Sequence, residues 1–284
     1  MEIRKITDDN IDEYEDFIDE DIAQSIGREF YRSIAIHDDG EEEPVAAVVW
    51  ELKDFEEDRD TEAEIEWLYI KDPKAGDMLM EEYKNEIMDD EVKRSFFEFE
   101  SMDKNSSAVI KKSGFTAEKA ESRDIVVTVE DLNNLSLVKK KTPPYIISIN
   151  DLMVRQFRKG ITNCLFHSRK GILEDLAFLP MSWYDSDVSC CVQTDEKVNG
   201  FLLVHRKASG ALVVDLLFAL EPDAKINLLN MIRYSINAAY DKFPPETEVI
   251  LRKHNGMTEA LIHKLFPNKK GAEVIKGEKK EEYE

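Results

Sequence analysis

The residues with the clearest chemical potential lie in one turn of the first half of the chain. Residues 64–70 mix glutamate with large apolar side chains, which predicts a strand, and Pro73 and Gly76 interrupt this pattern before a helical one begins. Lys71 and Lys74 belong to the same turn. Backbone N–H groups and positive charge at the start of a helix can hold a phosphate. An ordinary strand–turn–helix connection has the same pattern, and a single glycine is weak evidence for a phosphate site.

Two residues of the second half could transfer protons. Asp215 lies within residues 212–220, which are otherwise apolar, so it is expected to be either paired or functional, because burying an unpaired carboxylate is costly. His254 follows a predicted strand at residues 249–252 and could act as an acid or a base, although a capping or surface histidine is the more common explanation. The three cysteines form neither a disulfide pattern nor a metal-ligand pattern. We expect no metal site.

The charge of the chain is concentrated in its first half. Residues 1–141 hold 41 acidic and 19 basic side chains, which accounts for the whole net charge of −22, whereas the remaining residues hold 19 of each. This excess argues against nucleic acid or an anionic membrane as a partner. It favours a small-molecule amine or a basic peptide, although acidic runs are also common in solvated loops. No apolar run spans a membrane and the N-terminus does not resemble a signal peptide, so a cytoplasmic protein is expected.

The elements expected around these residues alternate between strands and helices. A helix is expected after the first strand, from Thr7 or Asp8 through Ile22, and another after the turn described above. A short helix at residues 106–113 ends at Gly114. The expected strands of the first half are residues 3–6, 30–37, 45–52, 64–70, 96–99 and 125–129.

The second half repeats this order. An offset of 149 residues places residues 65–87 on residues 214–236, with apolar side chains matched to apolar ones. An offset of 155 does the same for the apolar strand at residues 45–49, and an offset of 152 for residues 97–110. The offsets change only in loops, where insertions are tolerated. The sequence therefore predicts an internal duplication of one α/β unit.

The expected domains follow from this repeat. The first covers residues 1–136 and the second residues 145–276. Lysines and two prolines at residues 137–144 are typical of a linker, and residues 277–284 are charged and expected to be disordered.

Residues 103–115, a helix running into Lys-x-Gly-Phe, resemble the GCN5-related N-acetyltransferase (GNAT) family at this point of the order of elements. The resemblance covers nearly all of residues 1–130 and, more weakly, residues 145–276. It implies an α/β (α+β) fold of two tandem GNAT-like domains, each a mixed, mostly antiparallel twisted sheet flanked by helices. In this family the fourth and fifth strands splay apart. The pantetheine arm of acetyl-CoA lies in the gap and its pyrophosphate on the turn that follows.

The resemblance also implies roles for individual residues. A carboxylate on the fourth strand, Glu64 or Glu66, would be the general base, with Asp215 as its counterpart and His254 as a further catalytic candidate. The glutamates are equally consistent with outward-facing strand residues. Acetyl-CoA would contact Tyr69, Ile70, Lys71, Lys74, Ala75, Gly76 and Asp103 in the first half, and Leu217, Phe218, Lys225 and Asn255 in the second.

Departures from the family pattern leave the function open. Both turns are short and poor in glycine, and Ile110 and Ile262 stand where the family often has a tyrosine acting as general acid. One hypothesis is an acetyl-CoA-dependent N-acetyltransferase-like protein that acts on an unknown amine by direct transfer. The alternative is a catalytically degenerate GNAT-fold pseudoenzyme that binds a ligand or partner. A relative that uses aminoacyl-tRNA is disfavoured by the acidic first half.

Overall fold

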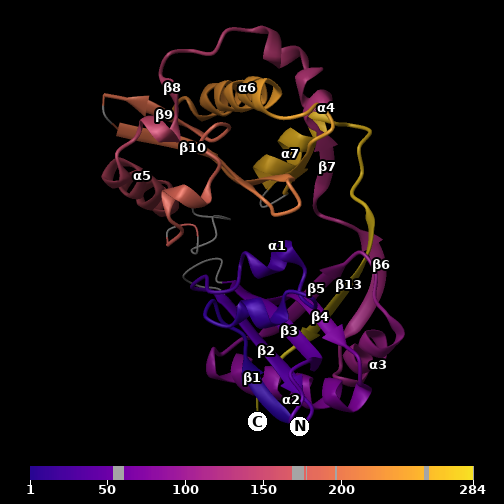
Figure 1. The fold of residues 1–284 in the computed structure, drawn as a ribbon. Coiled ribbons are helices and arrows are strands. Elements are labelled where there is room, and N and C mark those ends of the chain that lie inside the picture. Colours follow the sequence, from indigo (N-terminus) through magenta and orange to yellow (C-terminus); the bar gives the residue numbers. More distant parts are fainter. Residues whose placement is uncertain (54–60, 168–175, 177, 196, 253–255, 284) are drawn as a thin grey trace. The chain divides into compact units, whose positions relative to one another are not determined.

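The computed structural model describes residues 1–284 apart from residues 54–60, 168–175, 177, 196, 253–255 and 284 (Figure 1). The chain forms two compact units. Unit 1 consists of Met1–Ser122 and Ala272–Glu284, and unit 2 of Arg123–Gly271. Each unit contains one mixed sheet. Among the described residues, no helix has both the length and the apolar character needed to cross a membrane.

The sheet of unit 1 has seven strands in the order β1-β2-β3-β4-β5-β13-β6, and only the β4–β5 pair is parallel. Its strands are β1 (Glu2–Lys5), β2 (Tyr31–His37), β3 (Pro44–Lys53), β4 (Glu62–Ile70), β5 (Arg94–Phe99), β6 (Thr116–Glu121) and β13 (Glu273–Lys280). Every residue of β3 is buried, as its almost wholly apolar sequence predicts.

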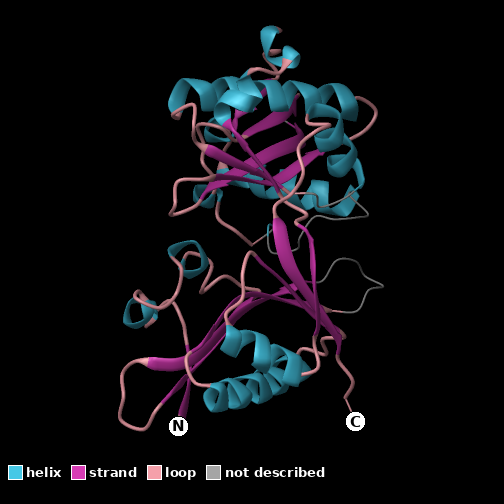
Figure 2. Cartoon of the chain, turned by 90° about the vertical axis from the view of Figure 1, so that its right-hand side faces the viewer, coloured by secondary structure: helices cyan, strands magenta, loops and turns pink. Residues whose placement is uncertain are grey.

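Two helices, α2 (Pro73–Asp89) and α3 (Lys104–Lys112), cover one face of this sheet (Figure 2). The opposite face packs against residues near the N-terminus, among them Tyr14 and Ile18. The single helix expected between Asp8 and Ile22 is wrong. This segment contains a short 3-10 helix, η1 (Ile11–Tyr14), and one turn of helix, α1 (Glu20–Ala23), which starts at the Asp19 cap.

The sheet of unit 2 has six strands in the order β7-β12-β11-β10-β9-β8, and only the β11–β12 pair is parallel. Its strands are β7 (Ile125–Thr128), β8 (Ile146–Ser148), β9 (Cys190–Thr194), β10 (Lys197–Arg206), β11 (Leu212–Ala219) and β12 (Glu248–Leu251).

Helices cover both faces of this sheet (Figures 1 and 2). One face packs against α4 (Val129–Asn133), α6 (Ala224–Lys242) and α7 (Gly256–Leu265). The other face packs against α5 (Val154–His167) and the 3-10 helix η5 (Met181–Trp183). Two further 3-10 helices, η2 (Ser136–Lys139) and η3 (Ile149–Asp151), belong to unit 2.

The two units exchange one strand each. Strand β13, from the end of the chain, pairs with β5 in unit 1, and β7, from the first half, pairs with the equivalent strand β12 in unit 2. The exchange differs from the expected domain boundaries, and it places the predicted closing strand of the first half in the other sheet. The prediction that residues 277–284 are disordered is wrong, since β13 extends to Lys280 and lies between two strands.

Packing explains both of these errors. A Cβ atom on Gly277 would lie 2.1 Å from the ring of Phe97 on β5, so the sheet requires a glycine at this position. The expected linker is also part of unit 2. Leu137 and Val138 pack against its core, and Arg233 Nε donates a hydrogen bond of 2.8 Å to the carbonyl oxygen of Leu137.

Candidate functional site

The parallel strand pair opens in both units. In unit 2 the pairing of β11 with β12 ends at Val214 and Leu251, although β11 continues to Ala219. In unit 1 the pairing of β4 with β5 ends at Ile65 and Phe97, although β4 continues to Ile70. Among the residues that the structure describes, the second part of β11 or β4 therefore has no strand partner on that side. This is the gap that the sequence resemblance implies.

A β-bulge marks the start of each gap. In unit 1, Val49 and Trp50 pair with Trp67 and Ile65, which leaves Glu66 as the extra residue. In unit 2 the same shift leaves Asp215 as the extra residue, between Val214 and Leu216. Bulges change the direction of a side chain and often occur next to active sites. Glu66 and Asp215 therefore occupy equivalent positions, as the offset of 149 residues predicts.

In unit 2, Asp215 is paired with a histidine. Nδ1 of His205 lies 2.6 Å from Oδ2 of Asp215, and their side chains are only 11% and 10% exposed. The ring of Trp183 packs beside the imidazole, with centroids 5.3 Å apart. When Nδ1 donates its proton to a carboxylate, Nε2 is the acceptor and the ring is fixed in orientation. The pair can therefore act as an oriented general base.

The helix that follows the gap, α6, begins without a side-chain cap from its N-cap residue. The Asp223 side chain makes no cap hydrogen bond, so it does not cap the first-turn amides of Ala224, Lys225 and Ile226. Lys225 is exposed. Together these groups offer backbone N–H donors, the positive end of a helix dipole and an ammonium group, which is a combination that suits a phosphate.

The remaining predicted residues of unit 2 lie on different sides of the sheet. Leu217 lines an apolar cavity of about 80 Å³ between the sheet and helices α6 and α7. Phe218 packs against the α5 side instead. His254 and Asn255 lie outside the described residues, so their predicted roles stay predictions.

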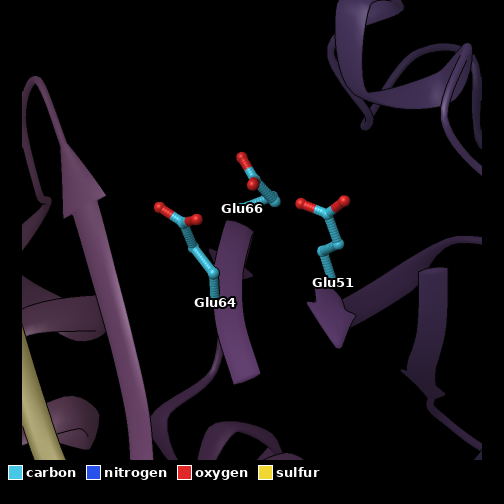
Figure 3. Close-up of side chains that lie close together, drawn as sticks. All are labelled: Glu51, Glu64 and Glu66. Atoms are coloured by element: carbon cyan, nitrogen blue, oxygen red, sulfur yellow. The ribbon is translucent and has the colours of Figure 1, made fainter. Parts of the chain in front are cut away.

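In unit 1, Glu66 belongs to a group of three carboxylates with Glu51 and Glu64 (Figure 3). Nζ of Lys53 lies 3.2 Å from Oε2 of Glu51 and 3.7 Å from Oε1 of Glu66, and it forms an ion pair with Glu64. Oxygens of the three carboxylates lie within 4.8 Å of one another. Glu51 is almost fully buried. Because the ammonium lies among the carboxylates, it compensates their mutual repulsion and competes for any cation that they could hold.

The turn after β4 has few free amide donors. The Asp72 carboxylate accepts a hydrogen bond from Lys74 N at 3.2 Å, and its carbonyl oxygen accepts one from Gly76 N at 2.9 Å. Pro73 has no N–H group. Among the first four residues of α2, only Ala75 keeps a backbone N–H group that is not bonded to Asp72. The amides of Lys74 and Gly76, two of the residues predicted to hold a phosphate, are therefore already bonded to Asp72.

Packing, and not a ligand, accounts for the glycine of this turn. A Cβ atom on Gly76 would lie 2.8 Å from Val109 on α3 and 2.9 Å from Ile70 on β4. The side chain of Asn105 on α3 donates a hydrogen bond of 3.0 Å to the carbonyl oxygen of Lys71. These contacts join the end of β4 to α2 and α3. Lys71 also lies near Glu43, at 3.5 Å.

Two further predicted residues of unit 1 have structural partners. Tyr69 stacks on Trp67 with ring centroids 6.1 Å apart and contacts Phe17. Asp103 caps α3 by accepting hydrogen bonds from Asn105 N, Ser106 N and the Ser106 hydroxyl. Burial raises the pKa of Asp103, but these hydrogen bonds outweigh it, so the pKa lies below its ordinary value.

Because of the strand exchange, the net charges of the two units differ more than the net charges of the two halves of the sequence. Unit 1 has 43 acidic and 18 basic side chains, a net charge of −25, and unit 2 has 17 and 20, a net charge of +3. A polyanionic ligand is therefore repelled by unit 1 and not by unit 2.

Sequence reasoning missed His205 and Glu51. The bulges align β3 with β10 at an offset of 154, because Val49 corresponds to Leu203 and not to Val204. His205 is therefore the counterpart of Glu51. The predicted offset of 155 aligned His205 with Trp50. Because of this error of one residue, the sequence comparison did not align His205 with Glu51, the two polar side chains at this position of an apolar strand.

No family model and no curated protein matches the chain. Solved structures do match. A tandem GNAT protein from the clavulanic acid biosynthesis pathway is 8% identical, with a TM-score of 0.61 over 100% of this chain and 99% of that one. A conserved protein of unknown function from Enterococcus faecalis, described as a probable N-acyltransferase, is 14% identical, with a TM-score of 0.53 over 97% and 72% of the two chains. A GCN5-related N-acetyltransferase from Sphaerobacter thermophilus is 13% identical, with a TM-score of 0.50 over 96% and 84%. These similarities identify the fold.

Proposed function

Because the chain folds as two GNAT domains in tandem, we propose that it is an acetyl-CoA-dependent N-acetyltransferase whose reaction centre lies in unit 2. One observation carries this proposal. The His205–Asp215 pair lies at the bulge where β11 separates from β12, and a histidine oriented by a carboxylate at the start of the gap supports a role as general base. The equivalent position of unit 1 contains Glu51 and Glu66 around Lys53.

Two features of unit 2 support binding of the donor there. The first turn of α6 would hold the pyrophosphate through its uncapped amides and Lys225, while the gap beside β11 would accept the pantetheine arm. The charge of +3 for this unit does not oppose a CoA molecule, whereas the charge of −25 for unit 1 does.

The proposed reaction is a direct transfer. The amine nitrogen attacks the thioester carbonyl carbon, and Nε2 of His205 takes the proton that the amine loses, while Asp215 stabilises the resulting imidazolium. The C–N bond forms, the C–S bond breaks, and CoA leaves as a thiolate that takes up a proton. Amide groups of β11 that face the gap have no β12 partner beyond Val214, so they are available to the carbonyl oxygen.

The acceptor is proposed to be a small-molecule amine or a basic peptide. The net charge of −22 attracts cations to the chain as a whole, with the excess in unit 1 and a charge of +3 on unit 2. Only a neutral amine can attack the thioester. A base in unit 2 is needed to take the proton that the amine loses.

A second candidate function is that of a catalytically degenerate binding module. Unit 1 favours it, because Asp72 caps the helix that would bind phosphate and Lys53 lies among the three carboxylates. We assign this degenerate state to unit 1 and the reaction to unit 2.

The test is release of free CoA thiol from acetyl-CoA in the presence of a panel of primary amines, polyamines and lysine-containing peptides. The proposal predicts amine-dependent release and an acetylated amine in the mass spectrum. Binding of acetyl-CoA without amine-dependent release for any member of the panel would favour the binding module instead.

A further inference from the structure

The apolar cavity of unit 2 lies where the gap between β11 and β12 closes. Val214 and Leu251, the last hydrogen-bonded pair of the two strands, both line it, and so does Leu217 just beyond the bulge. Its volume is about 80 Å³. Apart from Ser235, every residue that lines the cavity has an apolar side chain. A void of this kind stays dry and suits a hydrocarbon group.

The cavity lies well along α6 from the start of that helix, where the phosphates of the donor are proposed to bind. Helix α6 is the crossover between the parallel strands β11 and β12, so it runs antiparallel to both. Ile232, Ile236 and Ala239 line the cavity. They follow Lys225 by 7 to 14 residues, which corresponds to roughly 10–21 Å along the axis at 1.5 Å per residue. The cavity thus lies at the depth of the thioester end of a donor whose phosphates are at the start of α6.

The proposed base and the apolar cavity lie on opposite faces of the sheet. His205 and Asp215 are on the face that carries α5, near Trp183, whereas the cavity is on the face that carries α6 and α7. Beyond Val214 no residue of β12 pairs with β11, so a group bound in the gap would lie beside both faces. A thioester carbonyl in the gap would therefore meet the base on one side and could extend its acyl chain into the cavity on the other.

We infer that the acyl donor of unit 2 carries a short hydrocarbon chain longer than acetyl, of three to five carbons, which fills this cavity. The inference rests on the proposed function, because it takes CoA binding in unit 2 as given. An apolar cavity of about 150 Å³ accepts benzene, and a water-sized group takes roughly 30 Å³, so the volume here corresponds to about two or three methyl or methylene groups. A longer straight chain exceeds this space.

The test compares the dissociation constants of CoA, acetyl-CoA, butyryl-CoA and octanoyl-CoA for the full chain by isothermal titration calorimetry. Butyryl-CoA is expected to bind about tenfold more tightly than acetyl-CoA, which is the gain from burying two more methylene groups. Octanoyl-CoA is expected to lose this advantage.

Two substitutions show whether the cavity is responsible. Ala239→Leu fills it and is expected to abolish the preference for butyryl-CoA, whereas Ala238→Leu, one residue earlier and not in the cavity lining, is expected to retain it. Val214→Leu is a second filling variant in case Ala239→Leu fails to fold. Equal affinities for all thioesters, unchanged by filling, would overturn the inference and leave the proposed function standing. No binding of any CoA species would overturn both.

Discussion

His205 Nδ1 lies 2.6 Å from Asp215 Oδ2 in unit 2, and the residues at the same two positions of unit 1, Glu51 and Glu66, both face the ammonium of Lys53. One backbone arrangement, a bulge at the start of a gap, thus presents two different sets of side chains. The histidine with its carboxylate can take a proton from a substrate, whereas the glutamates are already paired. This difference is the physical basis for assigning the reaction to unit 2.

Replacing His205 by Gln is expected to lower amine-dependent CoA release by about 10²–10⁴-fold while acetyl-CoA still binds, because a general base acts in the chemical step. Asp215→Asn should cause a smaller loss, since it removes the charge that stabilises the imidazolium. The measurement is kcat and the dissociation constant for each variant. His263→Gln, an exposed histidine on α7, is the control. Normal kcat in His205→Gln would remove His205 from the mechanism.

Charge reversal at the two helix starts distinguishes the units. Lys225→Glu is expected to weaken acetyl-CoA binding at least about tenfold, because it replaces a charged contact to phosphate, worth about 1.5–3 kcal/mol, by repulsion. The readout is the increase in melting temperature with saturating acetyl-CoA, and Lys264→Glu on α7 is the matched control. Lys74→Glu should leave this increase unchanged. The opposite pattern, with Lys74→Glu alone losing the increase, would move the donor site to unit 1.

The strand exchange predicts a large effect from a substitution in the apparent tail. Gly277→Ala would place a Cβ atom 2.1 Å from the ring of Phe97, and overpacking of this kind costs about 1–3 kcal/mol. Denaturant unfolding should show the loss. In a double-mutant cycle, Phe97→Leu should make Gly277→Ala less costly, since the contact is shared. A neutral Gly277→Ala variant would mean that β13 does not lie against β5.

The cysteines should be unreactive in the folded chain. Burial raises the pKa of Cys164 and of Cys191 to about 12, and the pKa of Cys190 is also well above its ordinary value. At pH 8 a thiol reagent should therefore react slowly with the native protein and rapidly with all three thiols in denaturant. Fast labelling of the native chain would contradict the burial.

The same thiols give unit 2 a defined pH dependence. The unfolded chain ionises them above pH about 9, whereas the folded chain keeps Cys164 and Cys191 protonated up to pH about 12. Their contribution to stability is therefore fully present below pH 9 and is lost as the pH rises from 9 to 12. Unfolding free energies measured across this range should fall, and the slope should decrease in Cys164→Ala. An unchanged slope would show that the Cys164 thiol ionises over the same pH range in the folded and the unfolded chain.

The sequence predicts most of the fold because hydrophobic patterns report burial. The apolar strand at residues 45–52, the strand–turn–helix unit and their copies all occur close to the predicted bounds. Patterns along the chain do not report which strand a segment joins. Residues 125–128 have an ordinary strand pattern, whereas residues 273–280 have none. Pairing with β12 determines where the first segment lies, and pairing with β5 where the second lies. Charge along Gly277–Lys280 therefore suggested disorder in a segment that is paired on both sides.

The candidate site was predicted only in part. Asp215 was expected to be paired or functional because an apolar run surrounds it, and its partner is His205. The partner could not be identified, because a bulge shifts the register and bulges leave no clear mark in a single sequence. Gly76 was expected near a phosphate, yet close contacts with Val109 on α3 and Ile70 on β4 explain it, and such contacts depend on tertiary packing.

The most direct test is the stoichiometry of acetyl-CoA binding to the full chain, measured by isothermal titration calorimetry with the Lys225→Glu variant beside it. One site per chain is expected, lost or strongly weakened in Lys225→Glu, because α6 has no side-chain cap from Asp223 and unit 2 has a net charge of +3, whereas unit 1 has −25. No binding at millimolar acetyl-CoA, or binding that is unaffected by Lys225→Glu, would contradict it.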